Sequence, residues 1–505
     1  MDRAAWRRAK PDGRAPPGGP RGPASDFPFP SALIGSIIFV HMAHYDLIVI
    51  GGGPAGYVAA IRGAQHGKKV ACVENDRAGG TCLNWGCIPT KALLRNAELY
   101  HTLSHRAKEF GLKVEGLSYD WEAVIGRSRK VSDRLAGGIE FLFKKNKIDY
   151  LRGYGTIAGN STVEVAAADG KKETHTATHI LVATGCKSRE LPGLPFNGKT
   201  VVSSREALVL PQQPKSVIVI GAGAIGVEFA WFFNAYGTKV TVVEMLDNLL
   251  PIEDTDVSKA LEKSFKKQGI ATMLGHKTVS SQVTDDGVEI TVEPAKGGEK
   301  VVLKADLCLV AIGVQPVLPG GAERLQLTDR GYIQVNDRYE TTMKNVFAAG
   351  DIIGPPWLAH VASFEAIQAI DGIYKQGFVP KKVTTFPGCT YCHPQVASVG
   401  LTERAAREKG LAIKTGTFPF QALGKAQAVG ETDGFVKIIF GEKHGEVLGA
   451  HIIGENATEL IGEMGLAISM EATWDEIENT IHAHPTLSEA IHEATGVALG
   501  HPIHI

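Results

Sequence analysis

Two stretches of the chain repeat the same order of apolar, glycine-rich and polar-patterned segments. Residues 45–74 read YDLIVIGGGPAGYVAAIRGAQHGKKVACVE, and residues 215–244 read KSVIVIGAGAIGVEFAWFFNAYGTKVTVVE, at an offset of 170 residues. Each begins with a continuous apolar run, which predicts a buried strand. An amphipathic helix that ends at a glycine follows, and then a second apolar strand. The repeat therefore predicts two copies of one strand–helix–strand unit.

The turn between the first strand and the helix has the same glycine pattern in both copies: Gly51, Gly53 and Gly56, and Gly221, Gly223 and Gly226. The first glycine permits the tight turn, the second lets backbone N–H groups approach a pyrophosphate, and the third lets the helix pack on the strand. An acid follows 18 residues after the third glycine, Glu74 in one copy and Glu244 in the other, where a carboxylate binds a ribose diol. Two bound dinucleotides are predicted, each with its phosphates at a helix N-terminus.

Further apolar segments indicate how the two units are completed. THILVATG (178–185) and NVFAAGD (345–351) are expected to return to the first unit, and ADLCLVAIG (305–313) to close the second. Beyond Phe386, alternating strands at 435–440 and 447–454 precede a helical stretch at 457–470. The predicted fold class is α/β, with two Rossmann-like dinucleotide-binding domains and an α+β C-terminal domain.

Length, charge and cysteine content exclude several classes of protein. A chain of 505 residues is too long for one core, and its formal net charge of −1 argues against nucleic acid or an anionic membrane as the main partner. Seven cysteines, an odd and sparse set, exclude a secreted disulfide framework and favour a reducing compartment, the cytoplasm. Residues 1–41 are basic and rich in proline and glycine, and their apolar run at 32–40 is too short to span a bilayer. We expect them to be a disordered extension or an upstream-start artefact, with Met42 as the functional beginning.

Two cysteines, separated by four residues, lie in the segment GGTCLNWGCIPTK (79–91). Cys82 and Cys87 can close a small ring if the loop curls into the first turn of a helix, and Pro89 suits such a turn. A helix N-terminus lowers a cysteine's pKa, which thiol–disulfide exchange requires. Two buried thiols without redox chemistry remain the alternative, whereas a zinc site lacks further ligands at a suitable spacing.

This segment resembles the redox signature of the pyridine nucleotide–disulfide oxidoreductases, and the resemblance extends from Tyr45 to the end of the chain. It implies a disulfide between Cys82, which exchanges with substrate, and Cys87, which lies beside the flavin of FAD, with Lys91 near the flavin's reactive nitrogen. Trp85 is bulkier than the usual occupant of its position. The resemblance also implies the domain assignment: residues 42–190 and 316–385 bind FAD, residues 191–315 bind NAD, and residues 386–505 form a dimerisation domain.

A histidine motif near the C-terminus supplies a candidate base. In HAHPTLSE (482–489), His484 has the side chain suited to proton transfer at neutral pH, and Glu489 can hold its other ring nitrogen. Read alone, a histidine-rich turn of this kind is more often a surface loop. In the family it resembles, this histidine acts on the cysteine pair of the other subunit, which implies a homodimer with shared active sites. His482 is the weaker candidate for the base.

The resemblance carries over further positions that contact the two cofactors. Those assigned to FAD are Gly51, Gly53, Gly56, Glu74, Thr81, Lys91, Gly155 in an expected turn at 153–159, Thr184, Gly185, Asp351, Leu358, Ala359 and His360. Those assigned to NAD are Gly221, Gly223, Gly226, Glu228, Glu244 and Gly313. Because Glu244 would repel the extra phosphate of NADP and no arginine follows it in 245–251, NAD is the favoured nucleotide.

Within the family, the segments EMLDNLLPIEDTDVSK (244–259) and HAHPTLSEAI (482–491) most resemble the branch that oxidises dihydrolipoamide. That branch implies lipoyl domains of 2-oxoacid dehydrogenase or glycine cleavage complexes as partners. Two alternatives remain: a flavin disulfide reductase that runs from NAD(P)H toward another substrate, as mercuric or glutathione reductases do, and a non-catalytic FAD-binding subunit. Cys389 and Cys392 are expected to point to opposite faces of a strand rather than to form a second redox pair.

Overall fold

The computed structural model describes residues 43–505, so the expectations for residues 1–41 and for Met42 lie outside the described residues. The first sheet has the strand order β3-β2-β1-β6-β5-β4, and β17 also pairs with β6. Its strands are β1 (His44–Ile50), β2 (Val70–Glu74), β3 (Asp149–Arg152), β4 (Tyr154–Gly159), β5 (Thr162–Ala166), β6 (Lys172–Val182) and β17 (Val346–Ala348). Strands β2, β1, β6 and β17 run parallel. The expectation that segments near 180 and 347 return to the first unit is confirmed.

The second sheet has the order β11-β10-β9-β15-β8, and its central strands are parallel. Its strands are β8 (Val201–Val202), β9 (Ser216–Ile220), β10 (Lys239–Val243), β11 (Ala271–Met273) and β15 (Leu307–Val310). Strand β15 lies beside β9, as expected for the segment at 305–313. Beside this sheet is a small antiparallel one of β12 (His276–Val283), β13 (Val288–Pro294) and β14 (Val301–Ala305).

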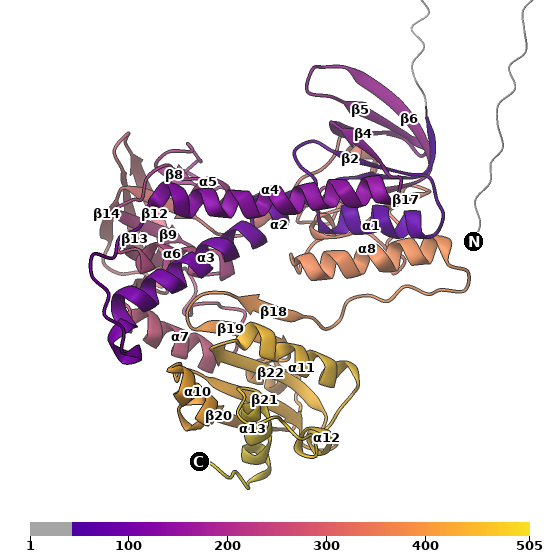
Figure 1. Ribbon diagram of the computed structural model, residues 1–505. Helices are drawn as coiled ribbons and strands as arrows, with labels where there is room; N and C mark the ends of the chain where they lie inside the picture. Colours follow the sequence, from indigo (N-terminus) through magenta and orange to yellow (C-terminus); the bar gives the residue numbers. More distant parts are fainter. Residues whose placement is uncertain (1–42) are drawn as a thin grey trace, which may run out of the picture. The chain divides into compact units, whose positions relative to one another are not determined.

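The helices after the two glycine turns differ in their surroundings. Helix α1 (Pro54–Gln65) buries one face and packs along α8 (Ala359–Tyr374), from a distant part of the sequence (Figure 1). Arg62 of α1 donates to both carboxylate oxygens of Asp371 in α8, at 2.6 and 2.7 Å. Helix α6 (Ala224–Ala235) is instead buried on almost every side. The expectation of an amphipathic second helix was wrong, because α3 (Cys87–His101) covers the face that solvent would otherwise meet.

The C-terminal part forms an antiparallel sheet with helices, which confirms the α+β expectation. The order is β18-β19-β22-β21-β20, with β18 (Pro387–Thr390), β19 (Gln395–Gly400), β20 (Ile413–Pro419), β21 (Phe435–Gly441) and β22 (Val447–Gly454). Helix α11 (Ala457–Ser469) packs on β19 and β22, and α13 (Glu489–Leu499) packs on β20 and β21. Among the helices of residues 43–505, none is long and apolar enough to cross a membrane.

A buried cation joins this sheet to the second nucleotide unit. Lys437 of β21 has 3 % of its side chain exposed and pairs with Asp254 at 2.9 Å, Asp256 at 2.6 Å and Glu403 at 2.7 Å. Asp254 caps α7 (Thr255–Lys267) and also accepts the backbone N–H of Glu403. These hydrogen bonds and the Lys437 charge outweigh burial, so the pKa of Asp254 is lowered.

Candidate active site

Both glycine turns leave no room for side chains. A Cβ on Gly51 would lie 2.3 Å from the carbonyl oxygen of Ala183, and a Cβ on Gly56 would lie 1.8 Å from that of Gly51. The second turn repeats this, because a Cβ on Gly226 would lie 2.0 Å from the carbonyl oxygen of Gly221. Both α1 and α6 begin right after these turns, so unpaired N–H groups at their N-termini are available to a phosphate.

The two acids at the ends of the second strands are held in the same way. The Glu74 carboxylate accepts the backbone N–H of Gly52 at 2.7 Å and that of Asp76 at 2.7 Å. The Glu244 carboxylate accepts the backbone N–H of Ala222 at 2.8 Å and that of Leu246 at 2.9 Å. Each carboxylate is thus anchored beside its glycine turn, where a carboxylate that binds a ribose diol belongs.

The groove beside the first turn contains polar atoms that no described group satisfies. The Thr184 hydroxyl is buried and has no hydrogen-bond partner in the described residues, and Gly185 follows it with a left-handed φ of 67°. Asp351 lies after β17, and burial raises its pKa to about 6. A buried unpaired hydroxyl and a buried carboxyl are costly unless a ligand pairs with them. These residues therefore fit a bound FAD, whose ribityl and phosphate groups carry the matching donors and acceptors.

The cysteine loop packs directly against this first turn. Gly80 touches Gly53 so closely that a Cβ on Gly80 would lie 2.6 Å from the Gly53 Cα. Helix α2 (Gly80–Trp85) contains Cys82, and Cys87 begins α3 after a break at Gly86. Burial and then the charges of both cysteines raise the pKa of Tyr57 in α1, which places the thiols beside the N-terminal part of that helix.

The two thiols are free and unequal. The Cys82 thiol hydrogen-bonds to Cys87, which raises the pKa of Cys82 and, with the Lys91 charge, lowers the pKa of Cys87 despite burial. Cys87 is therefore the sulfur that carries the negative charge in the reduced pair. That asymmetry suits a thiol that exchanges with substrate and a partner that holds charge.

Lys91 connects the cysteine loop to the second nucleotide unit. Its ammonium donates to both carboxylate oxygens of Glu228 in α6, each at 2.9 Å, and lies 4.5 Å from the centre of the Tyr391 ring. Glu228 is 4 % exposed and also accepts the backbone N–H of Tyr391 at 2.9 Å. Burial alone would lower the pKa of Lys91, but the attraction of Glu228 raises it. One ion pair thus links a residue assigned to FAD to one assigned to NAD.

The histidine motif lies apart from the cysteines within the chain. The Nδ1 of His484 is 2.8 Å from an oxygen of Glu489, and the second oxygen of Glu489 accepts the backbone N–H of Thr486 at 2.8 Å. The His484 side chain is 76 % exposed, and its hydrogen bond to Glu489 is the only one it makes within residues 43–505. Its Nε2 is therefore free to meet a group from outside this chain.

His482 is engaged instead. Its Nε2 lies 2.7 Å from Glu463 in α11 and its Nδ1 lies 3.1 Å from the carbonyl oxygen of Thr480, so both ring nitrogens have partners. Hydrogen bonding to Glu463 raises the pKa of His482. This histidine lacks a free nitrogen for proton transfer.

The remaining predicted positions lie mostly at the ends of elements. Leu358 caps the start of α8, which contains Ala359 and His360, and the Nε2 of His360 is 2.9 Å from the carbonyl oxygen of Pro387. Thr81 is an exposed residue of α2, and Gly313 follows β15 with a φ of 104°. None of these positions lies inside a packed core.

One local expectation was wrong. Residues 153–159 do not form a turn, because Tyr154–Gly159 is strand β4, paired with β5. Gly155 lies in this strand, and a Cβ at this position would lie 2.7 Å from the Ile50 side chain. The glycine therefore allows the two strands to pack closely.

Cys389 and Cys392 do not form a second redox pair. Cys389 lies on β18 and packs against the core of the C-terminal sheet, whereas Cys392 is buried in the core around α6. Both are free thiols, and burial raises the pKa of Cys389 to about 11. They were expected on opposite faces of one strand, but β18 ends at Thr390, so Cys392 lies beyond it and the two thiols are separated by packing into different cores.

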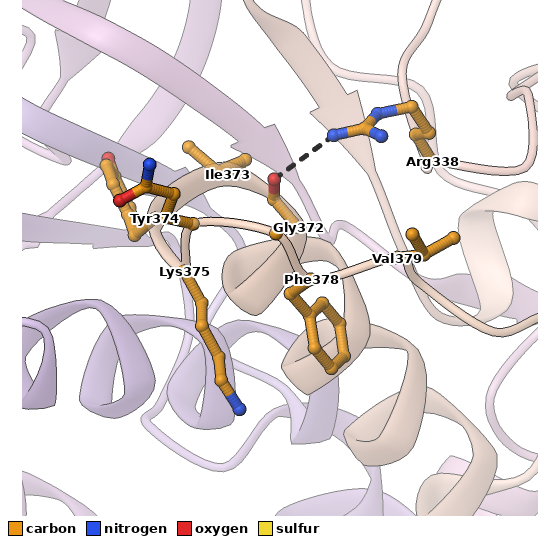
Figure 2. Close-up of a pocket in the computed structure, with 9 residues that line it drawn as sticks. Arg338, Gly372, Ile373, Tyr374, Lys375, Phe378 and Val379 are labelled. Atoms are coloured by element: carbon orange, nitrogen blue, oxygen red, sulfur yellow. Dashed lines mark hydrogen bonds between the residues drawn. The ribbon is translucent and has the colours of Figure 1, made fainter.

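A separate cavity on the described residues lies away from the cysteines. A cavity of about 460 Å³ is lined by Arg338 and residues 372–379, where the Arg338 guanidinium donates to the Gly372 carbonyl at 3.3 Å (Figure 2). It lies at the C-terminal end of α8, and α8 is 16 residues long, or about 24 Å at 1.5 Å per residue. The residues assigned to the flavin lie at the opposite end, so this cavity takes no part in the redox site.

Several residues around the cysteines were not identified from the sequence. Tyr57, Tyr391, Asp76, Arg129 and Arg205 come from five separate segments, and no short motif connects them. The sequence offered one indication: Trp85 is unusually bulky for its position between the cysteines, and it is the residue that Asp76, Arg129 and Arg205 contact.

Comparison with known proteins agrees with this arrangement. A family model described as pyridine nucleotide-disulphide oxidoreductase matches residues 45–366, and its dimerisation domain matches residues 386–495. The chain is 45% identical over 459 residues to a dihydrolipoyl dehydrogenase of Chlorobaculum parvum, covering 90% of this chain and 97% of that one. It is 44% identical over 470 residues to a dihydrolipoyl dehydrogenase of Bacillus subtilis, covering 91% and 99%. The crystal structure of LpdA from Mycobacterium tuberculosis superposes with a TM-score of 0.82 at 28% identity, covering 90% and 99%.

Proposed function

The chain belongs to the pyridine nucleotide–disulphide oxidoreductase family, as a flavoprotein that uses FAD and NAD, and we propose that it is a dihydrolipoyl dehydrogenase. In this proposal it oxidises protein-bound dihydrolipoamide and reduces NAD⁺ to NADH. The lipoyl domains come from 2-oxoacid dehydrogenase or glycine cleavage complexes, and the cytoplasm is the compartment. The domain assignment made above, with FAD on residues 42–190 and 316–385 and NAD on residues 191–315, is part of the proposal.

One observation carries the proposal: the cysteine pair lies where the two nucleotide units meet. The loop of Cys82 and Cys87 packs on the first glycine turn through Gly80, and Lys91, four residues after Cys87, pairs with Glu228 on the helix of the second turn. A dithiol pair between two dinucleotide sites suits electron transfer from a dithiol substrate to a pyridine nucleotide. FAD, when bound, supplies the carrier that passes two electrons on.

The chain's own residues account for the thiol steps. A substrate thiolate attacks the Cys82 sulfur, the Cys82–Cys87 bond breaks, and Cys87 leaves as a thiolate that Lys91 stabilises. The second substrate thiol then attacks the mixed disulfide, which closes the lipoamide ring and leaves Cys82 reduced. Two electrons and two protons leave the substrate, and the protein disulfide has become a dithiol.

A base must take the protons from the incoming thiols, and we assign this role to His484 of a second copy of the chain. Its free Nε2 and 76 % exposure support that assignment, as does the hydrogen bond to Glu489 that orients the ring. Exposed apolar side chains lie on neighbouring segments: Ile481, three residues before His484, is 97% exposed, and Leu466 and Met470, at α11 whose Glu463 contacts His482, are 64% and 71% exposed. An apolar patch beside an exposed base favours a twofold interface at this place.

The direct test of substrate is a comparison of steady-state rates. Holoenzyme is assayed with dihydrolipoamide and NAD⁺, and in parallel with oxidised glutathione or mercuric ion and NADPH. We expect turnover with the first pair to exceed the others by orders of magnitude. Turnover only in the assays that contain NADPH would identify the protein as one of the other reductases. No turnover with any pair of substrates would identify it as a non-catalytic flavoprotein.

The shared site is tested by mixing two inactive variants. Cys82→Ser chains are mixed with His484→Gln chains under conditions that exchange subunits. If the base acts across the twofold axis, each hybrid dimer has one intact site and about half the activity of a native dimer. Hybrid dimers without activity, shown by tagged subunits to have formed, contradict the assignment of His484 to the partner's thiols.

A further inference from the structure

The indole of Trp85 contacts two guanidinium groups. The centre of its ring is 4.0 Å from the guanidinium carbon of Arg205 and 5.0 Å from that of Arg129. Its Nε1–H donates to Asp76 at 2.8 Å, and Arg205 donates to the same carboxylate oxygen at 3.0 Å. We call these four side chains, Asp76, Trp85, Arg129 and Arg205, the indole clasp.

The members of the clasp come from separate parts of the fold. Asp76 follows β2 and Arg129 lies on α4 (Trp121–Lys145), while Arg205 lies on α5 (Ser204–Ala207), next to β8 of the second sheet. Arg129 also donates to the backbone carbonyl of Asn84, at 2.7 Å, so it contacts the loop at two adjacent residues, Asn84 and Trp85. The clasp therefore fixes the segment between the cysteines to both nucleotide units.

The loop depends on contacts with other segments. Leu83 is buried in the core of the first unit, and Asn84 donates to the carbonyl oxygens of Ala78 and Gly80 at 3.1 and 3.0 Å, whereas Trp85 is held by the clasp. Helix α2 has six residues, too few to be stable on its own, and it ends at Gly86, where the chain changes direction before α3. Cation–π contacts and a shared carboxylate supply the constraint that helix propensity does not. Because they act on Trp85, three residues after Cys82 and two before Cys87, they restrict how far the two sulfurs can separate.

We propose that Trp85 is a positioning residue that keeps the two thiols in contact when the disulfide is open. The proposal rests on the redox role of Cys82 and Cys87 proposed above. Two thiols that are held together in the reduced state lose less conformational freedom when the bond forms. The clasp therefore favours the disulfide and makes the reduction potential of the pair more negative than that of an unrestrained loop.

The test measures the dithiol–disulfide equilibrium of the holoenzyme without using its substrate. Wild type and Trp85→Val are equilibrated with mixtures of oxidised and reduced dithiothreitol, alkylated, and the peptide containing both cysteines is quantified by mass spectrometry. We expect Trp85→Val to favour the dithiol about tenfold, which for a two-electron couple is a potential about 30 mV less negative. The same variant should also turn over dihydrolipoamide more slowly than the wild type. Its FAD content should stay at the wild-type level.

A second variant keeps the test valid if Trp85→Val fails to fold. Arg205 is 52 % exposed, so Arg205→Met removes one side of the clasp with little change to the core, and we expect a shift of roughly threefold in the same direction. The matched control is Lys414→Met, which removes a cation 5.2 Å from the Trp474 ring in the C-terminal part and should leave the equilibrium unchanged.

The outcomes separate this inference from the proposed function. Lower stability of both clasp variants with an unchanged equilibrium constant overturns the positioning role and leaves a purely structural one. A wild-type pair that forms no disulfide at any ratio of the redox buffer overturns both proposals. A pair that titrates and responds to Trp85→Val, in an enzyme inactive on dihydrolipoamide, overturns the substrate assignment alone.

Discussion

Replacement of Glu244 should reveal how the enzyme chooses between NAD⁺ and NADP⁺. The carboxylate is fixed by the backbone N–H groups of Ala222 and Leu246, at 2.8 and 2.9 Å, which aims it at the ribose position beside the second glycine turn. A hydrogen bond to a charged group contributes about 1.5–3 kcal/mol, and about 1.4 kcal/mol corresponds to tenfold. Glu244→Ala should therefore raise the KM for NAD⁺ roughly ten- to hundredfold.

The same change should improve the use of NADP⁺, because the repulsion between Glu244 and the extra phosphate disappears. The gain is limited, since the exposed neighbours Met245 and Leu246 provide no positive charge, and the nearby Lys296 pairs with Asp247 at 3.4 Å. Glu244→Gln separates the two effects, because it keeps a hydrogen-bond acceptor and removes only the charge. Initial rates of dihydrolipoamide oxidation against both nucleotides provide the assay, and a wild-type preference for NADP⁺ would refute this account of the site.

Three further changes test other parts of the structure. Cys82→Ser should keep FAD bound and lower dithiol turnover by orders of magnitude, whereas Cys87→Ser should abolish the long-wavelength thiolate–flavin absorbance; wild-type lipoamide activity in both variants contradicts the assignment. Lys91→Met should raise the pKa of Cys87, so in a pH titration of the reduced enzyme the thiolate absorbance appears at higher pH than in wild type; an unchanged midpoint removes Lys91 as its stabilising charge. Lys437→Met leaves buried carboxylates without their cation and should lower the free energy of unfolding, measured with urea, by about 3–5 kcal/mol. Asp256→Asn changes only the exposed partner of Lys437 and should lower it by about 0–1 kcal/mol. Equal losses in the two variants exclude a central role for Lys437.

The stability that Lys437 and its carboxylate partners contribute should depend on pH. Because the pKa of Asp254 is lowered in the folded protein, the stability it contributes is fully present above its unfolded pKa. It is lost as the pH falls through the lowered, folded pKa. In Lys437→Met this acid-dependent loss should be smaller, since the cation that helps to hold the Asp254 pKa below its unfolded value is gone.

The sequence predicted those features whose physical cause is local. A Cβ cannot fit at Gly56 because the carbonyl oxygen of Gly51 in the same turn would lie 1.8 Å away, so this part of the motif is specified locally. The helix after Cys87 is likewise specified by residues close to it. His484 and Glu489 are five residues apart, and their 2.8 Å contact needs only a local turn.

Features that depend on distant segments were missed or misjudged. Helix α6 was expected to be amphipathic, yet its sequence AIGVEFAWFFNA is apolar on nearly every side, and only the fold shows that α3, from a distant part of the chain, covers it. The segment around Gly155 looked like a turn because of its glycines, yet pairing with β5 makes it a strand. The Lys91–Glu228 ion pair joins residues 137 positions apart, and only the fold brings them together.

The central claim is that electrons pass from dihydrolipoamide through Cys82 and Cys87 to NAD⁺. Its most direct test is an anaerobic single turnover in which oxidised holoenzyme is mixed with a stoichiometric amount of dihydrolipoamide and then with NAD⁺. The account predicts thiolate–flavin absorbance after the first addition, its loss after the second, and one NADH for each cysteine pair, with no NADH and no change in absorbance on either addition in Cys82→Ser. NADH formed equally well by Cys82→Ser, or a wild type that develops no thiolate–flavin absorbance, would contradict it.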